Sequence, residues 1–286
     1  MKIAITAASG KLGAAIVKAA IGLTSKDNVI ALARTPAKAM DLGVEVRPGD
    51  YDNPAQLEQS LQSIDVLLLV SGMDAPDKRI GQHRNVIEAA KKAGVKKIVY
   101  TSVQGAEEGT AFSPIIQSNR QTEQDVRDCG LAWAIGRNGI YIEPDLEYID
   151  TYKQEGGISN CAGEGKCGYT TRAELGFAYA KMLLENQHNG HTYNLNGEPI
   201  KQSELADYMN LAFGTELAFT SVSVEAYRLE RTKALGEFIG TVISGIYQSI
   251  REGKTNNPSD FEQAAGRPHI SWDVFFTDLK AKHQAG

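Results

Sequence analysis

The chain has 286 residues with a net charge of −5 and a pI near 5.6; 42% of the residues are hydrophobic and 23% are charged. This length allows one large domain or two modest ones, with a sizeable core. The acidic balance and the lack of a basic run argue against nucleic acid as the main partner. A mean hydropathy of −0.29, without any long apolar stretch, argues against a membrane partner.

The start of the chain and its cysteines predict a cytoplasmic protein. Met1-Lys2 leads directly into the first expected strand, so we expect no signal peptide. Cys129, Cys161 and Cys167 follow neither a disulfide framework nor zinc-ligand spacing, and we expect core thiols in a reducing compartment. The five histidines are scattered without a ligand pair at helical spacing, which predicts no metal site.

The first thirteen residues predict a nucleotide site. A short apolar run meets the turn Ala7-Ala8-Ser9-Gly10-Lys11-Leu12-Gly13, after which Leu12, Ile16, Ala20 and Leu23 follow at helical spacing. A strand, a glycine turn and a helix aim unpaired backbone N–H groups and the helix dipole at a phosphate. A full dinucleotide fingerprint has a third glycine where Ala7 stands, so Ala7 either has an ordinary conformation or carries strain of about 1 kcal/mol. A strand–turn–helix without a ligand is the alternative.

The second expected strand, residues 28–34, ends in a cation. In an NAD-binding unit, an acidic residue about 20 positions after the glycines binds the ribose 2′-OH. Here Arg34 takes that place, and a guanidinium can donate two hydrogen bonds to the 2′-phosphate that an acid would repel. We therefore expect NADPH (NADP) as the cofactor; the alternative is that Arg34 only ends a strand in solvent.

Strands and helices alternate through the first 136 residues with short connections, which predicts an α/β fold with a Rossmann-type, doubly wound parallel sheet. Ligands of such sheets bind past the carboxyl ends of the strands. The expected strands are 2–6, 28–34, 44–46, 64–70, 97–102 and 131–135. The expected helices are 12–23, one opened by Pro54, 79–93 and 118–129. The turns that should gather at one edge are 7–13, 34, 50–51, 71–72, 101–104 and 137–138.

After Asn138 the alternation ends. Residues 153–170 are glycine-rich and irregular, and a helix over 172–185, a strand over 191–195 and a short strand over 219–224 follow. We predict an NADP-binding Rossmann domain over 1–138, with a return segment over about 172–196. Residues 139–171 and 197–286 would form a smaller C-terminal α/β lobe that binds the substrate and closes over the cofactor.

Several motifs together are similar to one known family. They are Ala7–Gly13, Arg34–Ala39, Gly49–Tyr51, Gln82–Ala90, Tyr100–Ser102, Arg137–Tyr141, Thr171–Glu174, Ser259–Phe261 and Gly266–Pro268. With them the chain resembles, over nearly its full length, the NmrA-like branch of atypical short-chain dehydrogenases/reductases. Within this branch it is most similar to type 2 NAD(P)H:quinone oxidoreductases, and next to triphenylmethane reductases.

The resemblance implies NADPH in the cleft and hydride transfer to an electrophilic organic acceptor, such as a quinone or another aromatic small molecule. It implies that the catalytic residues Asn138 and Tyr141 lie near the nicotinamide or the substrate. It implies cofactor contacts at Ala8, Ser9, Gly10, Lys11, Leu12, Arg34, Asp50, Tyr51, Ser71, Gly72, Thr101 and Ser102.

Acid–base chemistry on alcohols is not expected. Short-chain dehydrogenases that oxidise alcohols need a Tyr-x-x-x-Lys pair, but none of the eleven tyrosines has a lysine four positions later, and Asn119 stands where that lysine would fall. A quinone is already electrophilic, so alignment of the two rings can supply much of the rate. Asn138 or Tyr141 could donate a hydrogen bond to a developing oxyanion; alternatively, Asn138 caps a turn and Tyr141 packs.

Other polar residues receive structural interpretations. Tyr148 and Tyr152 are expected to pack in the core or on the surface rather than to line an acceptor pocket. Glu123, Glu143 and Asp145 have no obvious partner in the sequence and are expected to be surface charges.

Two functions remain open. The first is an NADPH-dependent oxidoreductase acting on quinones or similar conjugated acceptors, with a cationic dye or a conjugated double bond as a further acceptor. The second is an NADP(H)-binding redox sensor that binds a protein partner without turnover. The sequence allows a monomer or a homodimer.

Overall fold

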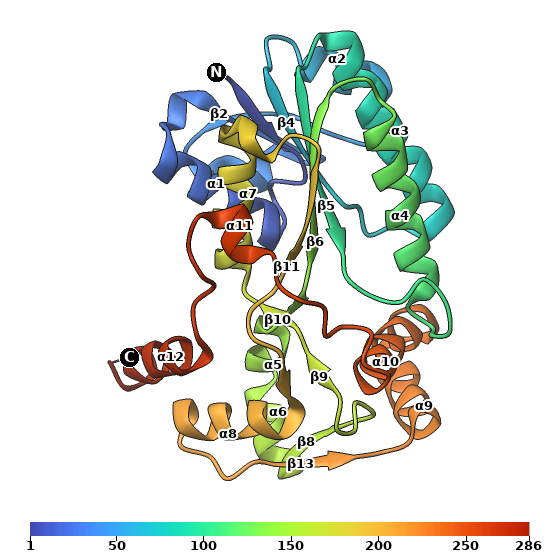
Figure 1. Cartoon of the computed structure of the whole chain (residues 1–286), viewed down its shortest axis with the longest axis vertical. Helices are drawn as coiled ribbons and strands as arrows, with labels where there is room; N and C mark the ends of the chain where they lie inside the picture. The colour runs from blue at the N-terminus through green and yellow to red at the C-terminus, as the bar shows by residue number, and fades with distance from the viewer. Residues whose placement is uncertain (286) are drawn as a thin grey trace.

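The computed structural model describes residues 1–285 and is built around a seven-stranded, fully parallel sheet (Figure 1). The strand order is β11-β6-β5-β4-β1-β2-β3, which confirms the α/β, Rossmann-type fold. The strands are β1 (Ile3–Ile5), β2 (Val29–Ala33), β3 (Glu45–Pro48), β4 (Val66–Val70), β5 (Lys97–Val103), β6 (Ala132–Asn138) and β11 (His191–Leu195).

Helices cover both faces of this sheet. Helices α1 (Lys11–Leu23), α7 (Arg172–Leu184) and α11 (Phe261–Ala265) pack on the face that receives Ile3 and Ile5. Helices α2 (Pro54–Ser60), α3 (Pro76–Ala93) and α4 (Ser113–Arg127) lie on the other face, which receives Ala4. Because side chains alternate along a strand, strands covered on both faces are apolar throughout.

The remaining segments form a smaller lobe at the carboxyl end of the strands, with its own core (Figure 1). Its three two-stranded sheets pair β10 with β7, β12 with β9 and β13 with β8. The strands are β7 (Ile140–Tyr141), β8 (Gly157–Asn160), β9 (Lys166–Cys167), β10 (Tyr169–Thr170), β12 (Ile200–Lys201) and β13 (Ala218–Ser221). The helices are α5 (Glu143–Glu147), α6 (Ile149–Glu155), α8 (Gln202–Phe213), α9 (Val224–Leu235), α10 (Glu237–Arg251) and α12 (Trp272–Ala285). The division into two domains at the proposed residues stays a prediction.

Several expected boundaries were wrong. Helix α3 begins at Pro76 rather than Arg79, and α4 begins at Ser113 rather than Ser118. In both, a proline occupies the first helical turn, where its missing N–H is no loss. The short strand β13 ends at Ser221, before Val224. Leu23, expected on the inner face, is 40% exposed because α1 ends there.

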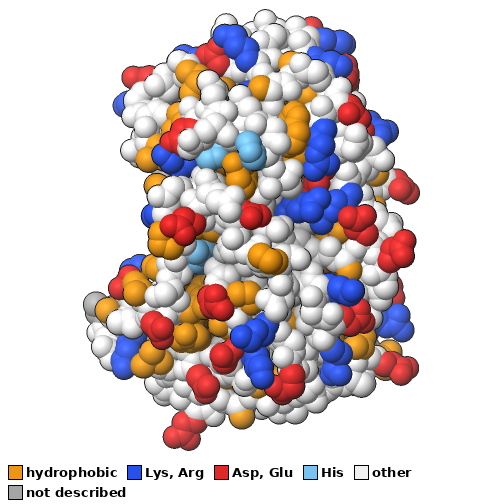
Figure 2. All heavy atoms as spheres, viewed as in Figure 1, with side chains coloured by type: hydrophobic (Ala, Val, Ile, Leu, Met, Phe, Trp, Pro, Cys, Tyr) orange, Lys and Arg blue, Asp and Glu red, His pale blue; other side chains and the backbone are white. Residues whose placement is uncertain are grey.

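The surface fits the composition. Figure 2 shows acidic and basic side chains interspersed on the face in view. Cys129, Cys161 and Cys167 are free and buried, which confirms the expectation of core thiols. No helix within residues 1–285 combines the length and the apolar character that crossing a membrane requires.

Candidate active site

The turn between β1 and α1 has the geometry of a phosphate-binding turn. Ala7 has a φ of +48°, so the strained alternative is the correct one, with a cost of about 1 kcal/mol. Its carbonyl accepts a hydrogen bond from the Gly10 N–H at 2.9 Å. A Cβ on Gly13 would lie 2.4 Å from the Ala7 oxygen, so glycine is required for α1 to start this close to the strand. The start of α1 is therefore fixed close to the carboxyl end of β1, where its N–H groups can meet a phosphate.

The cofactor-binding residues expected from the sequence gather at the carboxyl edge of the sheet, because they follow neighbouring parallel strands. They differ in exposure. Exposed are Ser9, Gly10, Lys11 and Arg34; partly buried are Asp50, Ser71 and Gly72; buried are Ala8, Leu12, Tyr51, Thr101 and Ser102.

Three of the buried residues use their hydroxyl groups inside the protein. Tyr51 donates to the Val70 carbonyl at 2.8 Å. The Thr101 hydroxyl accepts from the Ser71 N–H at 2.9 Å, and Ser102 donates to Glu123 at 2.7 Å. These hydroxyls hold the ends of β4 and β5 in place.

The loop after β4 is held by His83, a residue whose role the sequence did not reveal. Its Nε2 accepts from the Gly72 N–H at 2.9 Å, which places the ring proton on Nδ1, 2.9 Å from the Thr122 hydroxyl. His83 is fully buried, and this burial lowers its pKa to about 3. The ring is therefore neutral at physiological pH and acts as a fixed link between the loop, α3 and α4.

The two candidate catalytic residues lie side by side. Asn138 Nδ2 donates to the Tyr141 hydroxyl oxygen at 3.1 Å, while Asn138 Oδ1 accepts from the Tyr179 hydroxyl at 2.5 Å. Burial raises the pKa of Tyr141, so its phenol stays protonated. Within residues 1–285 no acceptor receives this proton, which leaves Tyr141 able to donate to a ligand.

The smaller lobe reaches the start of α1 through ion pairs that the sequence did not reveal. Lys11 Nζ lies 2.6 and 2.9 Å from the two carboxylate oxygens of Glu147. Arg172 Nη1 lies 3.7 Å from the same carboxylate, and its guanidinium faces the Tyr141 ring at 5.3 Å. A continuous set of contacts thus connects the phosphate-binding turn with Tyr141.

Asn119, in the position where a catalytic lysine was sought, has a structural environment. It is 2% exposed. Its Oδ1 accepts from the Tyr100 hydroxyl at 2.7 Å and from the Ser71 hydroxyl at 3.1 Å. An amide in this place orders the edge of the sheet and offers no titratable group.

The expectation that Glu123 is a surface charge was wrong. Its carboxylate is fully buried and accepts hydrogen bonds from Arg120, Arg127 and Arg137 at 2.7–2.9 Å. Burial alone would raise the pKa of Glu123, but the bonds from Arg137 and Ser102 and the charge of Arg120 lower it to about 2. Arg120 and Arg127 stand three and four positions away on the same helix, a spacing that could have indicated the pairing.

The expectation that Asp145 is a surface charge was also wrong. It is 5% exposed and accepts hydrogen bonds from the hydroxyls of Tyr152, Tyr169 and Tyr247 at 2.8, 3.0 and 3.1 Å. Burial raises its pKa. Glu143 is half-buried and accepts from the Arg172 N–H at 2.6 Å. Asp145 therefore joins α5, α6, β10 and α10 within the smaller lobe.

Arg34 is exposed at the end of β2 and has no ion-pair partner in the part of the chain that the structure describes. The nearby cation Lys78 is already paired, at 3.3 Å from both Asp52 and Asp74. Arg34 is therefore free to bind a 2′-phosphate, and the turn and Arg34 together fit a phosphorylated dinucleotide.

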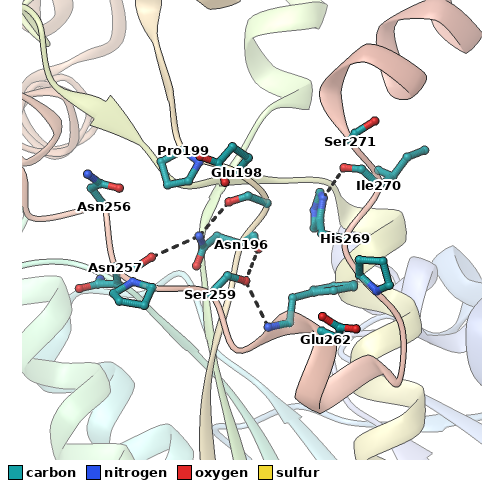
Figure 3. A pocket seen from close by; sticks show the side chains of 14 residues that line it. Asn196, Glu198, Pro199, Asn256, Asn257, Ser259, Glu262, His269, Ile270 and Ser271 are labelled. Carbon is teal, nitrogen blue, oxygen red and sulfur yellow. Dashed lines mark hydrogen bonds between the residues drawn. The ribbon is translucent and has the colours of Figure 1, made fainter.

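A separate pocket lies beyond β11, against α11 (Figure 3). Its polar side chains mainly bond to neighbouring protein groups. Asn196 donates to the carbonyls of Gly197 and Asn257, and Ser259 donates to the Asn196 carbonyl. None of the site residues expected from the sequence lines it.

The family described as NAD(P)H-binding matches residues 7–162. The chain belongs to this family. It is 35% identical to quinone oxidoreductase 2 of Escherichia coli (strain K12) over 225 residues, which cover 77% of this chain and 78% of the relative. It is 28% identical to an NmrA-like oxidoreductase of Aspergillus flavus, covering 89% of this chain and 86% of the relative.

Solved structures agree with this assignment. An NADPH-dependent quinone oxidoreductase of Escherichia coli, complexed with NADPH, superposes with a TM-score of 0.88 at 29% identity, covering 97% of this chain and 99% of the other. Citrobacter sp. triphenylmethane reductase, complexed with NADP(H), gives a TM-score of 0.87 at 30% identity, covering 98% and 100%.

These findings confirm the family resemblance, the fold and the NAD(P)H cofactor: the chain is an NAD(P)H-dependent oxidoreductase. The individual cofactor contacts and the catalytic roles of Asn138 and Tyr141 stay predictions.

Proposed function

We propose that this oxidoreductase uses NADPH to reduce quinones or similar conjugated aromatic acceptors, without a Tyr/Lys catalytic pair. The observation that carries the proposal is the Tyr141 phenol, which is held by Asn138 and keeps a proton available for a ligand. Relatives named quinone oxidoreductase 2 and NAD(P)H azoreductase support this acceptor class.

The preference for NADPH rests on Arg34. The N–H groups at the start of α1 would hold the pyrophosphate, and Arg34 the 2′-phosphate. Opposite charges in contact near a protein surface attract by about 4 kcal/mol before desolvation. About one third of this, ~1.4 kcal/mol, is enough for a tenfold preference.

The proposed reaction needs little from the protein beyond alignment of the nicotinamide ring with the acceptor ring. When bound, NADPH supplies a hydride and is oxidised to NADP⁺, while the quinone gains that hydride and one proton to become a hydroquinone. Tyr141 donates a hydrogen bond to the oxygen on which negative charge develops. Asn138 fixes the direction of that phenol, and solvent supplies the proton because the O–H protons of a hydroquinone exchange with water.

An NADP(H)-binding redox sensor is the second candidate. It fits Asn119 as well as the reductase does, because Asn119 offers no titratable group where short-chain dehydrogenases that oxidise alcohols carry their lysine. Such a protein would bind the cofactor tightly and act through a protein partner.

One experiment separates the two candidates. The loss of NADPH absorbance is followed with benzoquinones and naphthoquinones, with and without protein, and with NADH in parallel. We expect consumption well above background, and Arg34→Glu should raise the KM for NADPH by tenfold or more while leaving that for NADH nearly unchanged. Arg84→Gln, a change in an exposed arginine of α3 that pairs with Asp125, is the matched control. Tight NADPH binding without any consumption would favour the sensor.

A further inference from the structure

A group of tyrosines and one arginine in the smaller lobe has no role in the chemistry above. Tyr227 of α9 lies edge-on to Tyr247 of α10, with ring centroids 5.3 Å apart. The rings of Tyr148 and Tyr152 lie 5.8 Å apart. Tyr152 and Tyr247 both donate to Asp145, so one buried carboxylate fixes both pairs. We call Tyr148, Tyr152, Tyr227 and Tyr247 the tyrosine cluster.

Arg231 lies against this cluster with most of its donors unused. Its guanidinium carbon is 5.5 Å from the centroid of the Tyr227 ring, and its side chain is only 16% exposed. Nη2 contacts the neighbouring Glu230, whose side chain is 49% exposed. Nε is buried and has no hydrogen-bond partner in the part of the chain that is described. A mostly buried guanidinium paired only with an exposed carboxylate has capacity for a further anion.

The tyrosine cluster is linked to the candidate active site through Glu147. Tyr148 directly follows Glu147, the residue that pairs with Lys11 at the start of α1. Arg172 contacts both Glu147 and the Tyr141 ring. Tyr148 is 38% exposed, which leaves part of its surface free to contact a ligand.

We propose that Tyr148 and Arg231 form the acceptor-binding wall of the smaller lobe, and that Arg231 makes the enzyme prefer flat aromatic acceptors that carry an anionic group. Tyr148 offers a ring against which such an acceptor packs, and Arg231 offers a cation to its sulfonate or carboxylate. This inference rests on the proposed function, since it names the substrate class of the same site.

The test compares 1,4-naphthoquinone with 1,4-naphthoquinone-2-sulfonate. The quantity measured is the ratio of kcat/KM for the sulfonate to kcat/KM for the neutral quinone, at saturating NADPH. Comparing this ratio between variants cancels the difference in reactivity of the two quinones. Arg231→Gln should lower the ratio about tenfold, mainly through the KM of the sulfonate. Arg231→Lys should lower it less because the charge remains.

Three further variants separate this role from a structural one. Arg228→Gln, an exposed position on the same helix, should leave the ratio unchanged. Glu230→Gln should raise the ratio because it removes the competing carboxylate. Tyr148→Ala should lower kcat/KM for both quinones and leave the ratio nearly constant. If Arg231→Gln does not fold, the inference is tested by the ratio in the other two variants: it should fall in Arg231→Lys and rise in Glu230→Gln, and an unchanged ratio in both would overturn the inference.

The two proposals fail in different ways. Consumption of both quinones with a ratio unmoved by Arg231→Gln would overturn the inference and leave the proposed function intact. No consumption of any quinone would overturn the proposed function. In that case, binding of naphthalene-2-sulfonate to the NADPH-loaded protein, measured by calorimetry, would decide the inference: binding weakened by Arg231→Gln supports it, and equal binding or none overturns it.

Discussion

The Asn138 amide holds the Tyr141 hydroxyl, donating to its oxygen at 3.1 Å, and is itself held by Tyr179. Two residues named from the sequence are therefore in direct contact, with Asn138 positioning the Tyr141 hydroxyl, while donation from Tyr141 to a ligand stays a prediction. The Tyr141 proton points to no protein acceptor in the described chain, so a ligand oxygen is its natural partner.

Replacing Tyr141 with Phe should lower kcat for a naphthoquinone by about ten- to a hundredfold, because one donor to the developing oxyanion is lost. The KM for NADPH should change little. Steady-state kinetics at saturating NADPH measure this. Tyr208→Phe, in a ring stacked on Phe276 in the smaller lobe, is the control and should retain full activity. An unchanged kcat in Tyr141→Phe would exclude the phenol as donor.

Replacing Ala7 with Gly should raise the free energy of unfolding by roughly 0.5–1 kcal/mol, because glycine adopts a φ of +48° without a Cβ penalty. Urea denaturation measures this change in the free energy of unfolding. Ala8→Gly is the matched control: Ala8 is fully buried and has no positive φ, so this change should lower the stability by about 1 kcal/mol. Equal losses in both variants would show that the turn carries no strain.

Replacing Glu123 with Gln should destabilise the protein by about 3 kcal/mol at pH 7, because three arginines lose their common carboxylate. The folded pKa of about 2 lies below the ordinary value of 4.5. The stabilisation is therefore fully present above pH ~4.5 and is lost as the pH falls towards ~2. Urea denaturation of the wild type and of Glu123→Gln between pH 7 and pH 3 should show that the difference in their free energies of unfolding narrows as the pH falls.

Glu58→Gln is the control for this series, since the Glu58 side chain is 43% exposed and lies 3.8 Å from Lys92. Its stability should match the wild type at every pH. A gap between wild type and Glu123→Gln that stays constant down to pH 3 would contradict the assigned pKa shift.

Replacing Glu147 with Gln should tighten NADPH binding about two- to fivefold at low salt, because Lys11 becomes free to approach the pyrophosphate. The gain should disappear at high ionic strength, where charges at the surface are screened. Fluorescence titration with NADPH at two salt concentrations measures both effects. Glu155→Gln, at an exposed position of α6, should not change the affinity. Weaker binding in Glu147→Gln would mean that the ion pair supports the bound state.

The sequence predicted the elements whose signal is local. Strand β4 has five consecutive buried apolar residues, and the turn before α1 has its glycines at fixed spacing, so both could be read directly. The cofactor edge followed from the topology, because parallel strands bring their carboxyl ends together.

The missed features depend on residues far apart in the chain. Arg137, on β6, completes the site of Glu123, and Tyr247 reaches Asp145 across 102 positions. Lys11 and Glu147 are 136 positions apart. Neither periodicity nor spacing reveals these pairings, because they arise only when elements far apart in the sequence pack against one another.

The late position of β11 in the sequence affects how the protein folds during its synthesis. Residues 191–195 add the last strand beside β6, and α7 covers one face of the sheet, yet both follow the first part of the smaller lobe in sequence. During synthesis on the ribosome, the dinucleotide-binding sheet stays incomplete until about two thirds of the protein has emerged. A fragment that stopped at Asn138 would present a bare strand edge and an uncovered apolar face, both of which promote aggregation.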